Sequence, residues 1–139
     1  MKNLFFALFV VSCSSLSDGE FKKRYHLEDF KSKKPAAELH QELKVKMTKC
    51  YPQKDYPTYE KTVGKFNPKT ESGDIVYEID NQSMGAQPLL IVEVVKDGTG
   101  SIAKVYSKGS IFHPAGVYKH HVQKWVDGLK ADCHSHGKI

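Results

Sequence analysis

The sequence predicts an α+β fold: a two-layer sandwich in which two helices cover one face of a four-stranded antiparallel sheet. Apolar residues recur at helical spacing near both ends of the segment 35–133. Four short strand-like runs lie between these two segments, and the links that join them are too short for parallel crossovers. Two helices on one face of the sheet is the simplest arrangement that buries both apolar stripes.

The first helix is predicted over residues 35–50. Pro35 suits the first position of a helix, where the missing N–H of proline is not needed. Pro52 ends the helix, because the residue before a proline avoids the helical conformation. The apolar positions recur every three or four residues and are Ala36, Leu39, Leu43, Met47 and Cys50.

Four strands are predicted next, at 59–66, 74–80, 89–95 and 101–106, as an antiparallel meander. The third run is nearly all apolar, as expected of a central strand. The run Lys96-Asp97-Gly98-Thr99-Gly100 follows it and is a strong hairpin signal.

The second amphipathic helix is predicted over residues 117–133. Gly128 is a weak point inside it, because glycine costs about 1 kcal/mol relative to alanine in a helix. The tail 134–139 is expected to be frayed. The apolar positions of this helix are Val117, Tyr118, His121, Val122, Trp125, Val126 and Leu129.

Residues 1–12 have the pattern of a secretory signal peptide. Lys2 supplies one positive charge, and the eight residues 4–11 form an unbroken apolar run. That run is far shorter than the roughly 20 residues that a membrane-spanning helix needs.

The end of this segment, Val10-Val11-Ser12-Cys13, resembles the lipobox of bacterial lipoproteins. In that family a branched apolar residue stands three places before the cysteine and a small residue directly before it. The resemblance implies diacylglyceryl transfer to the Cys13 thiol, cleavage before Cys13 and acylation of the new amino group. Several acyl chains together anchor a protein stably. The alternative is an ordinary cleaved signal peptide with an incidental cysteine.

The residue after the cysteine bears on the destination of the chain. Ser14 resembles the outer-membrane type of Gram-negative lipoprotein, in which Asp is absent from this place. We therefore expect a lipid anchor in the outer membrane, on its periplasmic side. Residues 13–34 are expected to be the lipidated N-terminus and a flexible tether, 35–133 a single domain, and 134–139 the tail.

If Cys13 carries lipid, Cys50 and Cys133 remain as an even pair, which in an exported chain indicates a disulfide. Closing so long a loop contributes about 4 to 5 kcal/mol in chain-entropy estimates. The bond would join the C-terminal ends of the two predicted helices, and a parallel, side-by-side arrangement of the helices achieves this.

The formal net charge is +5, and it falls to +4 when Lys2 leaves with the signal peptide. Mild basicity beside a membrane suits contact with anionic lipid or glycan, although a solvated tether explains it more simply. A periplasmic address argues against nucleic acid as a partner. The expected partners are the membrane, through the lipid anchor, and an envelope protein.

Motifs for catalysis are missing from the sequence: it has neither a nucleophile elbow, a zinc-protease motif nor a phosphate-binding glycine loop. Ser110 near His113 is explained by hydrogen bonding within a loop. We therefore expect a non-enzymatic protein without a cofactor, acting as an adaptor or assembly protein of the envelope.

Two segments are candidates for a binding surface. Tyr51, Tyr56 and Tyr59 offer contact area with polar tips, although they equally suit a role in covering the disulfide. Ile111 and Phe112 form an apolar pair between turn residues, and core packing of Phe112 is the alternative.

Histidines near the C-terminus supply the alternative function, a small-ligand or metal-binding lipoprotein. His134 and His136 lie close to Cys133, and His-x-His with a nearby cysteine can bind zinc or copper. A disulfide at Cys133 argues against such a site, because it consumes the thiol.

Overall fold

The computed structural model describes residues 17–55, 58–81, 85–110, 113–130 and 133. It confirms the predicted α+β fold. The helices are α1 (Asp18–Tyr25), α2 (Ala36–Cys50) and α3 (Ala115–Val126), and the strands are β1 (His26–Ser32), β2 (Tyr59–Asn67), β3 (Ser72–Asn81), β4 (Gly85–Asp97) and β5 (Gly100–Ser107).

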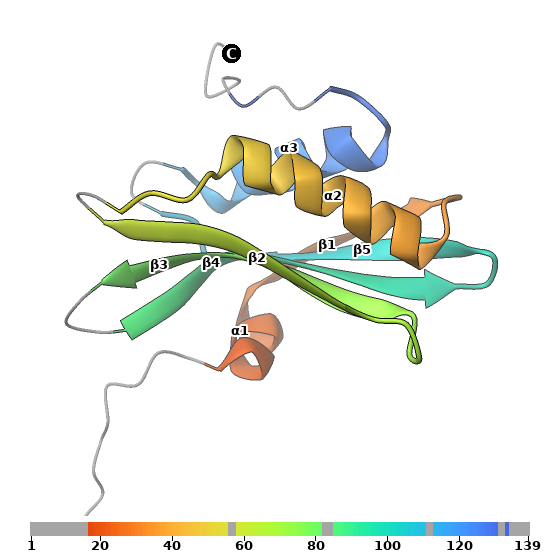
Figure 1. Cartoon of the computed structure of the whole chain (residues 1–139), viewed down its shortest axis with the longest axis horizontal. Helices are drawn as coiled ribbons and strands as arrows, with labels where there is room; N and C mark the ends of the chain where they lie inside the picture. The colour runs from red at the N-terminus through yellow and green to blue at the C-terminus, as the bar shows by residue number, and fades with distance from the viewer. Residues whose placement is uncertain (1–16, 56–57, 82–84, 111–112, 131–132, 134–139) are drawn as a thin grey trace, which may run out of the picture.

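The sheet has the strand order β1-β5-β4-β3-β2, and all neighbouring strands are antiparallel. The predicted four-stranded meander is therefore present as β2 to β5. β1 is a fifth strand that the sequence did not predict, and it pairs with β5 (Figure 1).

The flexible tether expected over residues 13–34 is wrong for residues 18–32, which form α1 and β1. Phe21 of α1 is only 1% exposed and packs with Ile91 and Tyr106, and Phe30 of β1 belongs to the main core. The sequence of this segment resembles a tether because Phe21 and Phe30 stand among charged residues. The apolar residues that they pack against are far away in the sequence.

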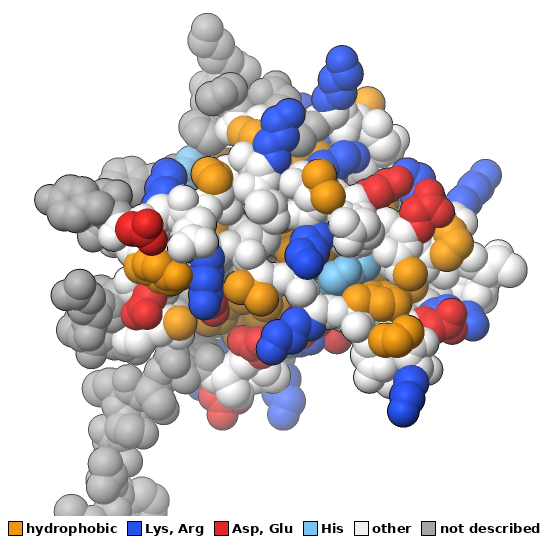
Figure 2. Space-filling model, viewed as in Figure 1, with side chains coloured by type: hydrophobic (Ala, Val, Ile, Leu, Met, Phe, Trp, Pro, Cys, Tyr) orange, Lys and Arg blue, Asp and Glu red, His pale blue; other side chains and the backbone are white. Residues whose placement is uncertain are grey.

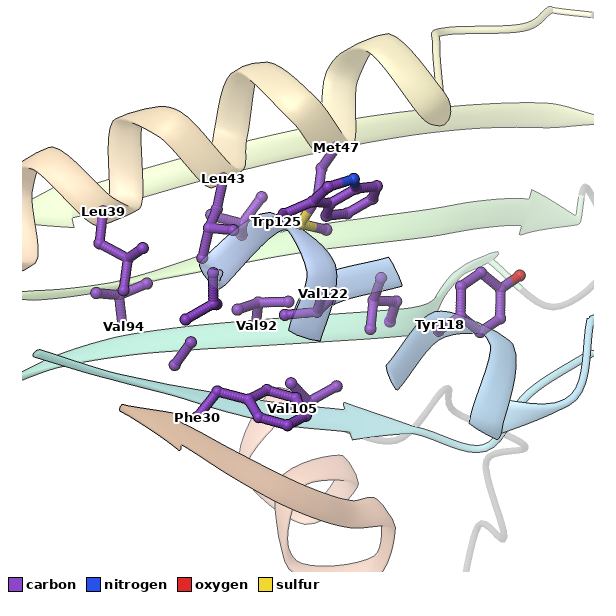
Figure 3. Packing of buried hydrophobic residues seen from close by; sticks show 14 of the residues in the cluster. Phe30, Leu39, Leu43, Met47, Val92, Val94, Val105, Tyr118, Val122 and Trp125 are labelled. Carbon is purple, nitrogen blue, oxygen red and sulfur yellow. The ribbon is translucent and has the colours of Figure 1, made fainter. Parts of the chain in front are cut away.

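Helices α2 and α3 lie on one face of the sheet, as predicted, whereas α1 lies on the opposite face (Figure 1). The main core fills the space between the sheet and the α2–α3 pair. Figure 3 shows Leu39, Leu43 and Met47 of α2 above Val92 and Val94 of β4, with side chains of α3 beside them.

The ends of the helices differ slightly from the predictions. Pro35 is the residue before α2 rather than its first residue. α3 ends at Val126, not near 133, because Gly128 adopts a positive φ of 82°. The amides of Gly128 and Leu129 donate to the carbonyls of Trp125 and Lys124, which is the Schellman pattern that closes a helix.

The disulfide between Cys50 and Cys133 is present, with 5.1 Å between the two Cα atoms. The expected parallel arrangement of the helices is wrong. Lys46 donates hydrogen bonds to the carbonyls at the end of α3, at Trp125 and Leu129, whereas Tyr51, after α2, contacts His121. The two helices therefore run in opposite directions, and Cys133 reaches Cys50 from a segment that follows α3.

Candidate functional site

A groove of about 670 Å³ lies on the face of the sheet that α1 covers only in part. α1 forms one side of this groove, and strands β2, β3 and β4 contribute its floor and rim. The lining residues are Asp18, Lys22, Lys61, Val63, Lys65, Phe66, Asn67, Thr70, Ser72, Gly73, Asp74, Val76, Glu78 and Glu93.

The groove exists because a short helix covers a wide sheet. α1 has only eight residues, and its one buried residue, Phe21, packs over β4 and β5 rather than over β2. Alternation along β3 turns Ile75 and Tyr77 into the main core and leaves Asp74, Val76 and Glu78 on the side of the groove.

Three rows of side chains cross the floor of the groove, as the strand register shows. Lys65, Asp74 and Glu93 are aligned in the first row, and Val63, Val76 and Ile91 in the second. Lys61 lies opposite Glu78 in the third row, and their side chains form an ion pair at 3.3 Å. The groove thus has an apolar row between two charged rows.

Lys22 holds α1 against the first row. Its ammonium nitrogen lies 2.9 Å from both carboxylate oxygens of Asp74 and 2.9 Å from Oε2 of Glu93. The other oxygen of Glu93 accepts a hydrogen bond from the Tyr106 hydroxyl at 3.1 Å. This network fixes the wall of the groove on its floor.

The network shifts the pKa values of its members. Burial alone would lower the pKa of Lys22, but the hydrogen bonds to Glu93 and Asp74 outweigh it and raise this pKa. Burial alone would raise the pKa of Glu93, but the hydrogen bond and charge of Lys22 lower it. Burial raises the pKa of Tyr106, with a further contribution from the charge of Glu93. Lys22 and Glu93 therefore stabilise each other in their charged forms.

The predicted tyrosine surface is only partly realised. Tyr51 packs against the main core, stacks on Tyr77 at 4.6 Å between ring centroids, and shares a 2.9 Å hydrogen bond with Nδ1 of His121. It therefore covers part of the main core, against which Cys50 packs as well. Tyr59 is exposed at the start of β2. Tyr56, Ile111 and Phe112 lie outside the described residues.

The remaining sites predicted from the sequence are the lipidation site, the metal site and the Ser110–His113 loop. Cys13, His134 and His136 lie outside the described residues. Within the part of the chain that the structure describes, no three His, Cys, Asp or Glu side chains are grouped to hold a metal ion. Ser110 and His113 bond to each other within their loop, as expected.

The groove itself was not predicted from the sequence, although two signals point to it. Ser17 and Glu20 have the spacing of a capping box, and the Ser17 hydroxyl accepts a hydrogen bond from the Glu20 amide at the start of α1. Lys61, Val63 and Lys65 also alternate along β2 with residues that face the helices. Neither signal shows that α1 and β2 border the same groove.

Comparisons with known proteins add no further assignment: no protein-family model matches this chain, and no curated protein or solved structure was found to match it. Among the helices of the described residues, none has the length and apolar character needed to cross a membrane.

Proposed function

We propose that this chain is a lipid-anchored protein of a Gram-negative envelope that acts without catalysis, as an adaptor or assembly protein on the periplasmic side of the outer membrane. The lipobox-like stretch that ends at Cys13 supports the anchor. The disulfide between Cys50 and Cys133 supports the compartment, because disulfides persist in oxidising environments. The observation that carries the proposal is that Asp18, which lines the groove, stands only five positions after Cys13 in the sequence.

The distance from the anchor to the groove is short. Asp18 lines the groove and is the first residue of α1, five positions after Cys13. Five positions span at most about 18 Å of fully extended chain. An acylated Cys13 would therefore hold the groove beside the membrane surface, within reach of a partner that lies at or in the same membrane.

The chemistry of the groove suits binding to a protein surface. Five of the seven charged side chains that line it are engaged in ion pairs, namely Lys22 with Asp74 and Glu93, and Lys61 with Glu78. The apolar row of Val63 and Val76 lies between them. An apolar centre with a charged rim is the usual composition of a protein–protein contact.

The anchor is tested by replacing Cys13. Cys13→Ala is expected to lose palmitate labelling and to release the protein from the membrane fraction, whereas Ser14→Ala is expected to keep both. Continued labelling of the Cys13→Ala variant would show that the lipobox interpretation is wrong.

The binding role is tested by photo-cross-linking in intact cells. A photoreactive amino acid at Val63, on the floor of the groove, is expected to give a discrete adduct with an envelope protein. Val45 is the matched control, because it is 57% exposed on α2, which covers the other face of the sheet. The absence of any adduct at Val63, or the same adducts from both positions, contradicts the proposal.

A further inference from the structure

Strand β2 is an edge of the sheet, and part of this edge is open. The amide of Glu60 donates to the carbonyl of Lys54 at 2.8 Å, and the amide of Lys54 donates back to the carbonyl of Glu60 at 2.9 Å. The backbone of Glu60 therefore faces outward, away from β3. Because alternate residues of an antiparallel strand face the same side, Thr62, Gly64 and Phe66 face outward as well.

A second observation supports the assignment of which β2 residues turn their backbone groups outward. A Cβ atom built on Gly73 would lie 2.7 Å from the Cα of Phe66, its partner on β2. Such a close approach is expected of a pair that does not exchange backbone hydrogen bonds. The backbone groups of Phe66 therefore point away from β3, in the same direction as those of Glu60.

The open part of the edge runs from Gly64 to Phe66. The beginning of the edge is occupied by the chain itself, because Lys54 pairs with Glu60 and the Thr62 hydroxyl donates to the carbonyl of Tyr51. Among the described residues, no hydrogen-bond partner is found for the amide of Gly64 or Phe66. Unpaired amides and carbonyls on an edge strand are a template for another strand.

Lysines border this open edge. The side chain of Lys44, on α2, lies against Gly64, with its Cδ only 2.9 Å from the position that a Cβ of Gly64 would occupy. Lys61 and Lys65 lie on the groove side of β2. Lys44 and Lys65 form no ion pair with any described residue. Figure 2 views the molecule from the β2 side and shows lysine side chains across the middle of this face.

The positive charge of these lysines decides which kind of strand can pair with the open edge. A second copy of β2 would bring the lysines of both copies together, and like charges across a strand pair are destabilising. Edge lysines are a known device against such self-pairing. The same lysines attract a strand that carries carboxylates, because opposite charges across a strand pair are stabilising.

We propose that the β2 edge from Gly64 to Phe66 binds an extended, acidic segment of a partner protein as an added strand. The backbone hydrogen bonds would supply affinity, and a carboxylate on the groove side of the added strand would lie beside Lys65. This inference rests on the proposed adaptor function and names the chemistry of its partner.

The test uses the full chain in mild detergent with its disulfide intact. The probe is the blocked hexapeptide acetyl-Glu-Val-Glu-Val-Glu-Val-amide, whose carboxylates share one face of a strand. Amide hydrogen exchange is expected to slow roughly tenfold or more at Gly64 and Phe66 when the peptide binds. The inward-facing amides of Val63 and Lys65, which bond to β3, are expected to change little. The matching Lys-Val peptide is expected not to bind.

Two pairs of variants sharpen the test. Gly64→Pro removes an outward-facing N–H and is expected to abolish peptide binding, whereas Gly64→Ala also adds a Cβ beside Lys44 but keeps this N–H and is expected to bind. Lys65→Glu is expected to weaken binding at low salt by roughly tenfold, whereas Lys23→Glu, the same charge change on the exposed side of α1, is expected to leave it unchanged. The Lys65 pair decides the question if Gly64→Pro does not fold.

Three outcomes overturn the inference: equal binding of the lysine peptide, unchanged binding by the folded Gly64→Pro variant, or concentration-dependent self-association through β2. Each leaves the proposed function standing if Val63 still cross-links to an envelope protein in cells. Conversely, the absence of a Val63 adduct contradicts the proposed function whatever the peptide does.

Discussion

The ammonium of Lys22 lies 2.9 Å from both carboxylate oxygens of Asp74, a residue 52 positions later in the chain. Asp74 is directly opposite Glu93 in the register of β3 and β4, and Lys22 lies within 2.9 Å of that carboxylate too. One cation on α1 therefore bridges two neighbouring carboxylates on the sheet, and it attaches the wall of the groove to the floor.

Replacing this cation should loosen α1. Lys22→Ala leaves two carboxylates side by side and is expected to lower the free energy of unfolding by about 1–2 kcal/mol. Lys23→Ala, on the exposed side of α1, is expected to change it by less than about 0.5 kcal/mol. Urea unfolding measures both variants, and hydrogen exchange of the α1 amides reports local loosening. Equal stability of the two variants would show that the network contributes nothing.

The same network predicts a loss of stability in acid. The pKa of Glu93 is lower in the folded chain than its ordinary value of 4.5, so the unfolded chain binds more protons below that pH. The contribution of Glu93 is therefore complete above pH 4.5 and is lost as the pH falls through the folded pKa. Urea unfolding at several pH values between 3 and 7 should show a shallower decline for Glu93→Gln. If the Glu93→Gln variant lost stability in acid as steeply as the natural chain, Glu93 would not be a source of the acid sensitivity.

His40 is expected to make the stability of the fold depend on pH in a second range, at higher pH than Glu93. Burial lowers its pKa below 6.5, against a weaker opposing effect of the hydrogen bond to the carbonyl of Asp74. The unfolded chain therefore takes up this proton first, and the folded chain loses stability as the pH falls below 6.5. His40→Gln is expected to remove this part of the pH dependence, and replacement of the exposed His120 by Gln is expected to retain it. Thermal unfolding between pH 5 and 7.5 distinguishes the two.

Loss of the disulfide should be costly. The bond between Cys50 and Cys133 closes a loop of 83 positions, for which chain entropy predicts a contribution of about 4.5 kcal/mol. The double replacement Cys50→Ala, Cys133→Ala is expected to lower the free energy of unfolding by a comparable amount. Dithiothreitol should lower the unfolding temperature of the natural chain and leave the double variant unaffected. An effect of dithiothreitol on both proteins would point to another cause.

The proposed anchor at Cys13 predicts that partner binding depends on the length of the connection between Cys13 and α1. A Gly/Ser insertion of about 20 residues before Ser17 adds roughly 25 Å of mean reach. Because the groove then leaves the membrane surface, the cross-linked adduct at Val63 should weaken while palmitate labelling persists. A two-residue insertion is the control and should preserve the adduct. An undiminished adduct with the long insertion would mean that the partner does not depend on the distance from the membrane.

Elements with strong local periodicity were predicted correctly from the sequence. The stripe from Ala36 to Met47 is the buried side of α2, and Gly98-Thr99 is the turn between β4 and β5, where Gly98 has a positive φ. The partners of these residues did not have to be known, because the spacing of apolar residues and the turn chemistry act over a few positions.

Elements that depend on distant partners were missed. The packing of Phe21 on the sheet can be recognised only when Ile91 and Tyr106 are known to lie beneath it. Lys22 can be recognised as part of the groove only when its ion pairs with Asp74 and Glu93 are known. The direction of α3 relative to α2 was likewise decided by contacts such as that between Tyr51 and His121.

The sequence by itself determined the meander, the two helices that cover it, the pairing of Cys50 with Cys133 and the expectation of an anchor at Cys13. Only the tertiary structure decided that the charged segment 18–32 folds onto the sheet, and that the edge strand β2 borders a groove that Asp18 and Lys22 of α1 also line. The physical reason is range. Periodicity and turn chemistry act locally, whereas a groove is formed by side chains from strands and helices that meet only when the whole chain has folded.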